Sequence, residues 1–266
     1  MKEVHETPWA YDASPFRITD DIWYVGNASV ASHTIDTGEG LLLIDTGYPQ
    51  TTYLLIESIR AAGFDPNAIQ WILHTHVHYD HIGATRALVE KFGCKTFLGS
   101  RDADILQNRH ELIWHLEYGL AFNEEFKPDV LVNDGDKLRF GNICVECIAS
   151  PGHTPGNMTY LWNTRVNGIP YTAAITGGFY PNTATSKYIH KYGIPNPRQD
   201  FEYTFRRLAE LRVDVTLGSH PVFNDAFERA SGITKNTNPF IDPAEWQREL
   251  EIGRRRFCEL CDQDPL

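Results

Sequence analysis

The segment His74-Thr75-His76-Val77-His78-Tyr79-Asp80-His81 places four histidines and one aspartate within eight residues, directly after the apolar run Trp71-Ile72-Leu73. Imidazole is the commonest metal ligand in proteins, and a carboxylate beside it adds negative charge for a divalent cation. His76 and His78 are two residues apart, a spacing that directs both rings to one side of an extended segment. The Asp80-His81 pair follows where the chain leaves the expected strand. The segment therefore predicts a metal site at a strand end.

Two further histidines lie far downstream, and each follows an expected strand. The loop 150–156 carries His153 between prolines and glycines and comes directly after the apolar run 143–149. The run 213–219 has the pattern of a buried strand and leads into His220. Three separate strands thus each end in histidine, so we expect their ends to meet at one rim of the fold.

With these motifs the chain resembles the metallo-β-lactamase superfamily, through His76-x-His78-x-Asp80-His81 and the later Pro-Gly-His153-Thr-Pro-Gly. The similarity keeps the same order over nearly the whole chain, from Ile22–Gly26 to the closing segment Asn238–Pro243. It implies an α/β fold, the four-layer αββα sandwich, with metals bound at one edge of the two sheets. A length of 266 residues is compatible with a single large domain over residues 1–266.

The resemblance also points to a subclass, because one ligand of the superfamily is missing. Most hydrolases of the superfamily place a bridging aspartate after the next strand, and the first lactamase subclass places a cysteine there. Here the strand 171–176 runs into Gly177-Gly178, which can supply neither. The third lactamase subclass also lacks this ligand and has a serine at the place that matches Gly178. The ligand pattern is therefore similar to that of the third subclass.

Carried over from that subclass, the resemblance implies two zinc ions per chain. The first zinc would be bound by three histidines and the second by an aspartate and two histidines; these are His76, His78 and His153, and then Asp80, His81 and His220. A zinc-bound hydroxide would attack the carbonyl of a cyclic amide, and Asp80 would orient it as a catalytic residue besides being a ligand. The resemblance thus predicts a zinc-dependent hydrolase of the β-lactamase type.

The segment 101–130 contributes no predicted ligand but carries the aromatic residues Trp114, Tyr118 and Phe122. In the resembling lactamases the matching stretch forms a loop that walls the substrate cleft. We therefore expect Trp114 and Tyr118, together with Gly178 and Tyr180, to contact the substrate. The alternative is that the aromatic side chains of 101–130 pack onto the sandwich as core.

The composition of the chain restricts the kinds of partner that the protein can bind. The net charge of −11 argues against nucleic acid, whose phosphates require a basic face, and no run of 18 apolar residues is present to span a membrane. The expected partner is a small-molecule substrate.

The first residues lack the apolar core of a signal peptide, which predicts a cytoplasmic location, or a periplasmic or secreted one if a leader was removed. Five cysteines are interpreted as structural thiols, including Cys258-x-x-Cys261, which resembles a metal or redox pair.

Three functions stay open. The first is a zinc β-lactamase of the third subclass, and the second is a cytosolic lactonase or other ester or amide hydrolase with the same di-zinc site. The third is a non-hydrolytic binding or redox protein with a vestigial site. Because one scaffold hosts many reactions, the fold and the ligands alone do not decide among them.

The remaining expectations concern local structure. Asp45 ends a strand, and we interpret it as a structural group that hydrogen-bonds the loop under the metals. Asp242, followed by Pro243, is expected to cap the final helix. Strands are expected near 22–26, 29–36, 41–45, 70–75, 95–99, 143–149, 157–163, 170–176 and 213–218, and helices near 50–62, 82–92, 102–108 and 199–211.

Overall fold

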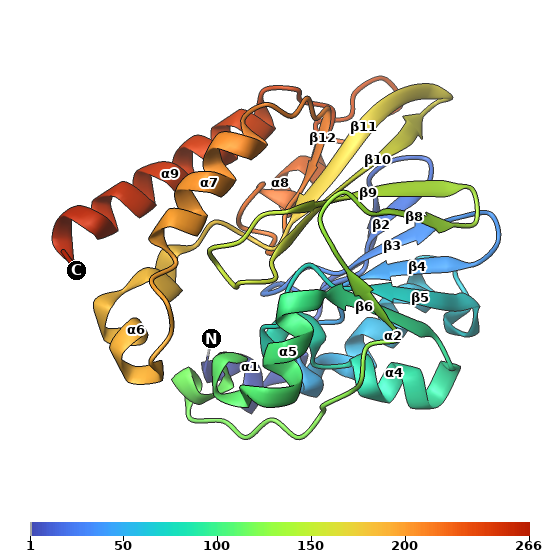
Figure 1. The fold of residues 1–266 in the computed structure, drawn as a ribbon. Coiled ribbons are helices and arrows are strands. Elements are labelled where there is room, and N and C mark those ends of the chain that lie inside the picture. Colours follow the sequence, from blue (N-terminus) through green and yellow to red (C-terminus); the bar gives the residue numbers. More distant parts are fainter. Residues whose placement is uncertain (1) are drawn as a thin grey trace.

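The computed structural model describes residues 2–266, with side chains from Val4 onward, and contains two β-sheets (Figure 1). The first sheet has seven strands in sequence order, antiparallel from β1 to β4 and parallel from β4 to β7. These strands are β1 (Phe16–Arg17), β2 (Ile22–Tyr24), β3 (His33–Asp36), β4 (Leu41–Ile44), β5 (Ile69–Leu73), β6 (Lys95–Gly99) and β7 (Val130–Val132).

The second sheet has five strands in the order β12-β11-β10-β9-β8. Its strands β8 to β11 are antiparallel neighbours, and β12 lies parallel to β11. They are β8 (Lys137–Phe140), β9 (Ile143–Ala149), β10 (Met158–Val166), β11 (Ile169–Thr176) and β12 (Val215–Leu217).

The inner faces of the two sheets form one hydrophobic core. Ile35 and Leu42 of the first sheet belong to the same buried cluster as Val145 and Tyr160 of the second. Side chains alternate between the two faces of a strand, so each strand gives every second residue to this layer. The sheets therefore pack face to face, as in a sandwich.

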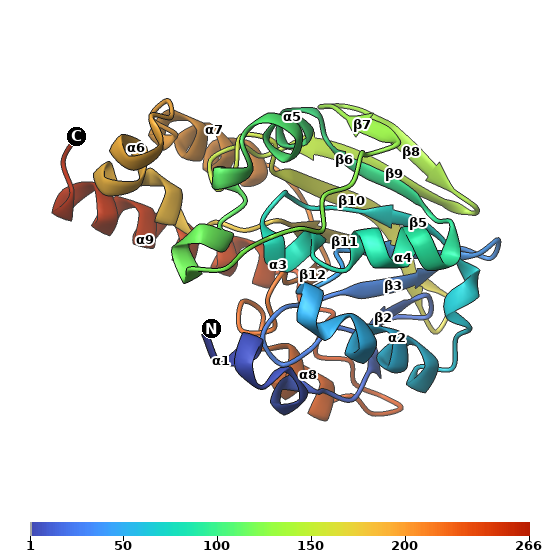
Figure 2. The same cartoon turned by 90° about the horizontal axis from the view of Figure 1, so that it is seen from below.

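Helices cover both outer faces (Figures 1 and 2). Helices α2 (Thr52–Ala61) and α4 (Thr85–Phe92) pack on the first sheet, and α7 (Arg198–Leu208) and α9 (Glu245–Gln263) pack on the second. In α7 the buried residues include Phe201, Phe205 and Leu208, which recur at helical spacing. The order helix, sheet, sheet, helix confirms the predicted four-layer sandwich. The other α-helices are α1 (Lys2–Glu6), α3 (Tyr79–Ile82), α5 (Ser100–Asn108), α6 (Ser186–Tyr192) and α8 (Ala226–Ser231).

The local expectations are mostly confirmed, with shifts at element ends. The strand expected from residue 29 begins only at His33, and the short strands β1, β7 and β8 were not anticipated. The prediction for Asp242 is wrong, because α9 begins at Glu245 with Ala244 as its N-cap. Asp242 instead accepts the Ala244 N–H at 3.1 Å, and its own carbonyl accepts the Glu245 N–H at 3.0 Å. Pro243 therefore lies in a turn that precedes the helix.

The segments that follow β5, β9 and β12 carry the predicted ligands. Parallel strands such as β4 to β7 end at the same edge of a sheet, so the chain after β5 leaves at that edge. Among residues 2–266, no helix has the length and apolar character needed to cross a membrane.

Candidate metal centre

The first group of ligand atoms comes from two loops. His76 and His78 follow β5, and His153 lies in the loop between β9 and β10. Val77, between the first two, is fully buried in a separate apolar cluster, so the rings on either side of it turn together toward His153. One nitrogen from each of the three rings lies within 4.8 Å of the others. The structure thus brings together the three histidines predicted for the first metal.

The second group lies beside the first. Asp80 and His81 are in the one-turn helix α3, and His220 follows β12. One carboxylate oxygen of Asp80 lies 3.5 Å from His81 Nε2 and 3.6 Å from His220 Nε2, and these two nitrogens are 3.3 Å apart. The rings of His76 and His81 approach to 4.1 Å between centroids, so the two groups are adjacent. All six predicted ligands therefore converge.

Three of the histidine ligands donate a hydrogen bond through Nδ1, the ring nitrogen that faces away from the centre of the site. These hydrogen bonds determine which nitrogen is left to bind a metal. His153 Nδ1 donates to the carbonyl oxygen of Tyr180 at 2.9 Å, and His220 Nδ1 donates to that of Ser29 at 2.8 Å. His81 Nδ1 donates to the Asp45 carboxylate at 2.9 Å. A neutral imidazole has one proton, so the Nε2 atoms of these rings carry lone pairs. Such outer partners are typical of metal-binding histidines.

The other two histidine ligands also have an Nε2 atom that no proton donor contacts. The Nε2 atoms of His76 and His78 are buried and have no hydrogen-bond partner within the described chain. An unpaired buried acceptor is costly, and here several converge with one carboxylate. Two cations at the centres of the two groups would satisfy these atoms, so the residues present fit a binuclear metal site.

Burial keeps the histidines in the form that binds metal. It lowers the pKa of His81 and of His153 to about 4, from an ordinary value of 6.5. It also lowers the pKa of His76 and of His78 well below that value, and the neighbouring histidines lower both further. These four rings are therefore neutral at pH 7, with lone pairs available to a metal.

Asp45 has the predicted structural role and one more. Its carboxylate accepts the Thr75 N–H at 2.8 Å and the Thr75 hydroxyl at 2.7 Å, which holds the loop before His76. It also orients the ring of His81, a contact between residues 36 positions apart that the sequence did not reveal.

Asp102, in the first turn of α5, was missed by the sequence analysis. This fully buried carboxylate accepts the Val77 N–H at 2.9 Å, the Thr154 hydroxyl at 2.7 Å and the Gly156 N–H at 2.7 Å. It thereby connects the loop of His76 and His78 to the loop of His153. An aspartate at a helix start is an ordinary pattern, so no sequence signal distinguished it.

Of the histidines outside both groups, His74, His110 and His115 are the ones nearest in sequence to the motif or on the loop that lines the cleft. His74 contacts the Thr85 hydroxyl at 3.2 Å, and His110 faces Glu125 at 3.2 Å. His115 is buried and lies against Phe122. The structure thus keeps these three apart from the ligand atoms.

A cleft of about 490 Å³ opens over the two groups. Its lining includes all four residues expected to contact substrate, namely Trp114, Tyr118, Gly178 and Tyr180. From the same loop, His115 and Phe122 are buried. The loop 101–130 therefore lines the cleft with Trp114 and Tyr118 and buries His115 and Phe122, and contact of the first two with a substrate stays a prediction.

Gly177 and Gly178 differ in the space around them. A Cβ on Gly177 would lie 1.9 Å from Asn157 Oδ1 and 2.8 Å from His76 Nδ1, so no side chain fits there. A Cβ on Gly178 would meet nothing closer than 3.8 Å, although its φ of +131° disfavours other residues. Gly178 lies in the cleft lining with ligands from both groups, where a side chain has room.

Comparison with known proteins agrees with this geometry. The family model of the metallo-β-lactamase superfamily matches residues 25–164, more than half of the chain, and the protein belongs to this superfamily. Membership supports hydrolase chemistry at a metal centre.

The fold is that of the subclass B3 enzymes. The structure is similar to BJP-1, a subclass B3 metallo-β-lactamase of Bradyrhizobium japonicum, with 26% identity, 98% of each chain covered and a TM-score of 0.86. It is also similar to the metallo-β-lactamase GOB-18 from Elizabethkingia meningoseptica, with 28% identity, 96% and 95% covered and a TM-score of 0.84.

The curated sequence relatives are more diverse. A hydroxyacylglutathione hydrolase of Chelativorans sp. is 31% identical over 45% of this chain and 37% of its own length. The matched stretches span less than two thirds of the length of the curated relatives. The superfamily is therefore established, whereas the substrate has to be inferred from the site.

Proposed function

We propose that this protein is a di-zinc hydrolase that opens cyclic amides of the β-lactam type. The observation that carries the proposal is the convergence of His76, His78 and His153 beside Asp80, His81 and His220, with lone pairs inward. Zinc suits such nitrogen and carboxylate donors. The likeness to two lactamases over nearly the whole chain supports the lactam as substrate.

When bound, two zinc ions would lower the pKa of a water toward about 7 and polarise a substrate carbonyl. The protein's own contribution is to hold the six ligands and to handle the proton. Asp80 provides the only carboxylate among the residues that line the cleft. We assign it the role of accepting the proton of the attacking water and passing it to the leaving nitrogen, because its carboxylate has a second oxygen besides the one that serves as ligand, whereas each neutral histidine has a single lone pair.

The walls of the cleft would position the substrate. Trp114 and Tyr118 lie on one loop and Tyr180 follows β11, so aromatic side chains line the cleft from two separate segments of the chain. Flat aromatic surfaces suit a bulky organic ring system. Gly178 leaves open the space that a side chain would fill, which enlarges the cleft beside the metal site.

The test is steady-state hydrolysis by the zinc-loaded protein of a penicillin, a cephalosporin, a carbapenem and a set of lactones. We expect turnover of at least one β-lactam, lost on zinc chelation and restored by zinc. The control is Glu251→Gln, an exposed change on α9 that lines neither the cleft nor the neighbouring cavity, which should leave turnover unchanged. Turnover of lactones alone would refute the lactam assignment.

One observation favours the second candidate, an ester, thioester or lactone hydrolase. No lysine or arginine is among the residues that line the described cleft. β-Lactam antibiotics carry a carboxylate beside the ring, which arginine or lysine recognises well. A neutral ester would not need such a partner, and the likeness to a hydroxyacylglutathione hydrolase points the same way. The same screen, extended to a thioester, separates the two candidates.

A further inference from the structure

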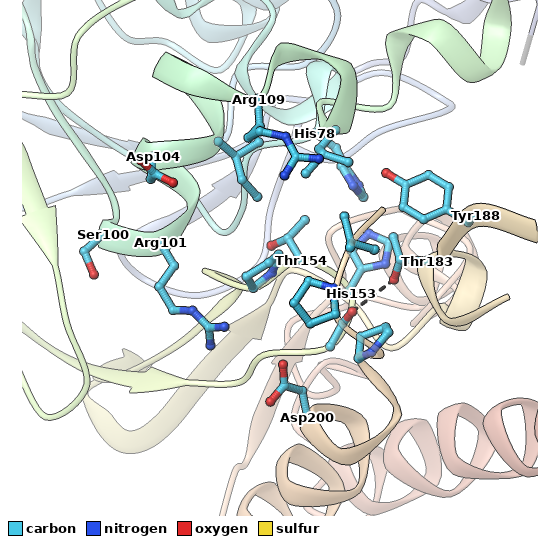
Figure 3. A pocket seen from close by; sticks show the side chains of 17 residues that line it. His78, Ser100, Arg101, Asp104, Arg109, His153, Thr154, Thr183, Tyr188 and Asp200 are labelled. Atoms are coloured by element: carbon cyan, nitrogen blue, oxygen red, sulfur yellow. Dashed lines mark hydrogen bonds between the residues drawn. The ribbon is translucent and has the colours of Figure 1, made fainter. Parts of the chain in front are cut away.

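A second cavity adjoins the metal centre on the side away from the His220 group. It has a volume of about 440 Å³ and is drawn in Figure 3. His78 and His153 line both this second cavity and the cleft, so the two spaces meet at the first group of ligands. The second cavity is therefore the space next to the cleft on the side of His78 and His153.

An aromatic pair marks the boundary between the two spaces. Trp114 lines the cleft, Tyr188 lines the second cavity, and their rings stack with centroids 4.9 Å apart. Trp114 has a φ of +78°, a left-handed conformation that is strained for a residue other than glycine. The loop thus holds the indole against Tyr188 and beside His78, whose ring centroid is 5.5 Å away. An arm that leaves the cleft would pass this pair.

The second cavity has an apolar wall and four charged side chains, of which Asp104 and Arg109 have partners in the protein and two of opposite sign remain. Ile105, Leu112, Ile194 and Pro195 line it, which suits the methylene groups of a chain. Arg101 extends from α5 and Asp200 from α7, and in Figure 3 both lie across the cavity from His78 and Tyr188.

Neither of these two charges has a direct side-chain partner within the described chain, although Arg101 is near enough to the buried Asp102 to interact with it through charge. Neither the Arg101 nor the Asp200 side chain has a hydrogen bond there or an ion pair within 4.0 Å, to each other or to any other group. Arg109, the other arginine of the lining, is already bound to Glu111 and to the carbonyl oxygen of Tyr192 at 2.9 Å. Asp104, the other aspartate, accepts a hydrogen bond from the Asn108 amide at 2.7 Å. Arg101 and Asp200 are thus available to a ligand with both a carboxylate and an ammonium group.

We propose that the second cavity binds the side arm of the substrate, and that this arm has an apolar chain ending in an α-amino acid. The inference rests on the proposed function, since the arm is attached to the group that reacts in the cleft. Arg101 binds the terminal carboxylate, and Asp200 binds the terminal ammonium. The cleft has no cationic side chain of its own, so the charged end of such a substrate is recognised in the second cavity.

Two cephalosporins provide a matched test. Cephalosporin C and cephalothin share the ring nucleus and the acetoxymethyl group, but the acyl arm is aminoadipoyl in the first and thienylacetyl in the second. Binding is measured by calorimetry on the metal-free protein, where no turnover occurs, and KM is measured on the zinc-loaded protein. We expect cephalosporin C to bind about tenfold more tightly than cephalothin, the scale of one or two charged hydrogen bonds at a partly exposed site.

Variants assign the preference to the two residues. Arg101→Ala and Asp200→Asn should each bring the ratio of the two binding constants close to one, and Arg101→Lys should keep part of the preference. Arg254→Ala, an exposed arginine of α9 that does not line the second cavity, is the control and should keep the wild-type ratio. Both Arg101 and Asp200 are at least partly exposed, and unchanged melting temperatures will show that the variants fold.

The outcomes separate this inference from the proposed function. If the metal-free protein prefers cephalosporin C through Arg101 and Asp200 but the zinc-loaded protein hydrolyses neither compound, the lactam assignment is wrong and the arm site stands. Equal binding of the two compounds, binding of neither, or a preference that survives both substitutions overturns the arm site. If the arm site is overturned in this way but the zinc-loaded protein hydrolyses both cephalosporins with equal KM, the proposed function is unaffected.

Discussion

Replacing Asp102 by alanine should weaken the fold at the point where the two histidine loops join. The substitution leaves the N–H groups of Val77 and Gly156 and the hydroxyl of Thr154 without their buried acceptor. An unpaired buried group costs roughly 1–3 kcal/mol, so three give about 6 kcal/mol at the middle of that range.

Part of this loss in the free energy of unfolding is offset, because the substitution also removes a buried charge. Burial raises the pKa of Asp102 to about 6 from 3.8, despite its hydrogen bonds, and a shift of this size corresponds to roughly 3 kcal/mol. The net destabilisation at pH 7 is then about 3 kcal/mol. For a chain of this size it corresponds to a decrease of roughly 6–12 °C in Tm.

The pH dependence gives the prediction a second test. The folded Asp102 carboxyl holds its proton at pH values where the unfolded one has lost it. The wild type therefore has an extra contribution to stability below about pH 4, which is lost as the pH rises through about 6. The difference in stability between wild type and Asp102→Ala should accordingly be larger at pH 4 than at pH 7.

The assay is thermal and urea unfolding of the metal-free proteins, so that metal release does not affect the result. Asp104→Ala, on the exposed face of the same helix, is the matched control and should change stability by no more than about 0.5 kcal/mol. If Asp102→Ala unfolds within the error of that control, or if its effect grows with pH, the account of Asp102 is refuted.

Three further predictions concern the metal site. Metal analysis of zinc-loaded wild type should give two zinc ions per chain and that of His220→Ala about one; a wild type that never binds a second zinc would disprove the second group. Gly178→Asp should bind zinc more tightly, since it adds an anionic oxygen beside both groups, although its φ of +131° should cost roughly 1–3 kcal/mol in unfolding experiments. Gly177→Asp, the comparison, should fail to fold stably because of the contact with Asn157, and equal behaviour of the two variants would contradict this. His74→Ala should keep its zinc while losing about 1–2 kcal/mol with the Thr85 contact, and zinc loss in a folded variant would mean that the ligand set is misassigned.

Much of the metal site could be predicted from the sequence because its signals are local. The alternation of His76, Val77 and His78 determines that two rings share one side while valine enters the core. The missing acidic residue at Gly177-Gly178 is equally a local fact, and it indicates the subclass. The strands before His153 and His220 could be recognised from their apolar runs, so the three strand ends were expected to meet.

Other features depend on contacts between distant parts of the chain. Asp102 binds groups 25, 52 and 54 residues away, and Asp45 orients His81 from 36 residues away. For Asp45 the sequence predicted the hydrogen bonds to the loop but not the contact with His81, and for Asp102 it predicted no role. Such long-range pairings are not encoded in any periodicity along the chain.

The sequence by itself thus determined which side chains can bind metal and on which side of their strand they lie, because backbone geometry fixes that over two or three residues. Only the tertiary structure showed that Asp45 also orients His81 and that Asp102 joins the two histidine loops, and it alone brought Arg101 and Asp200 from two helices to one cavity beside His78 and His153. The physical reason is that hydrogen bonding and charge recognition act over a few ångströms. Which groups come that close is set by how the sheets and helices pack.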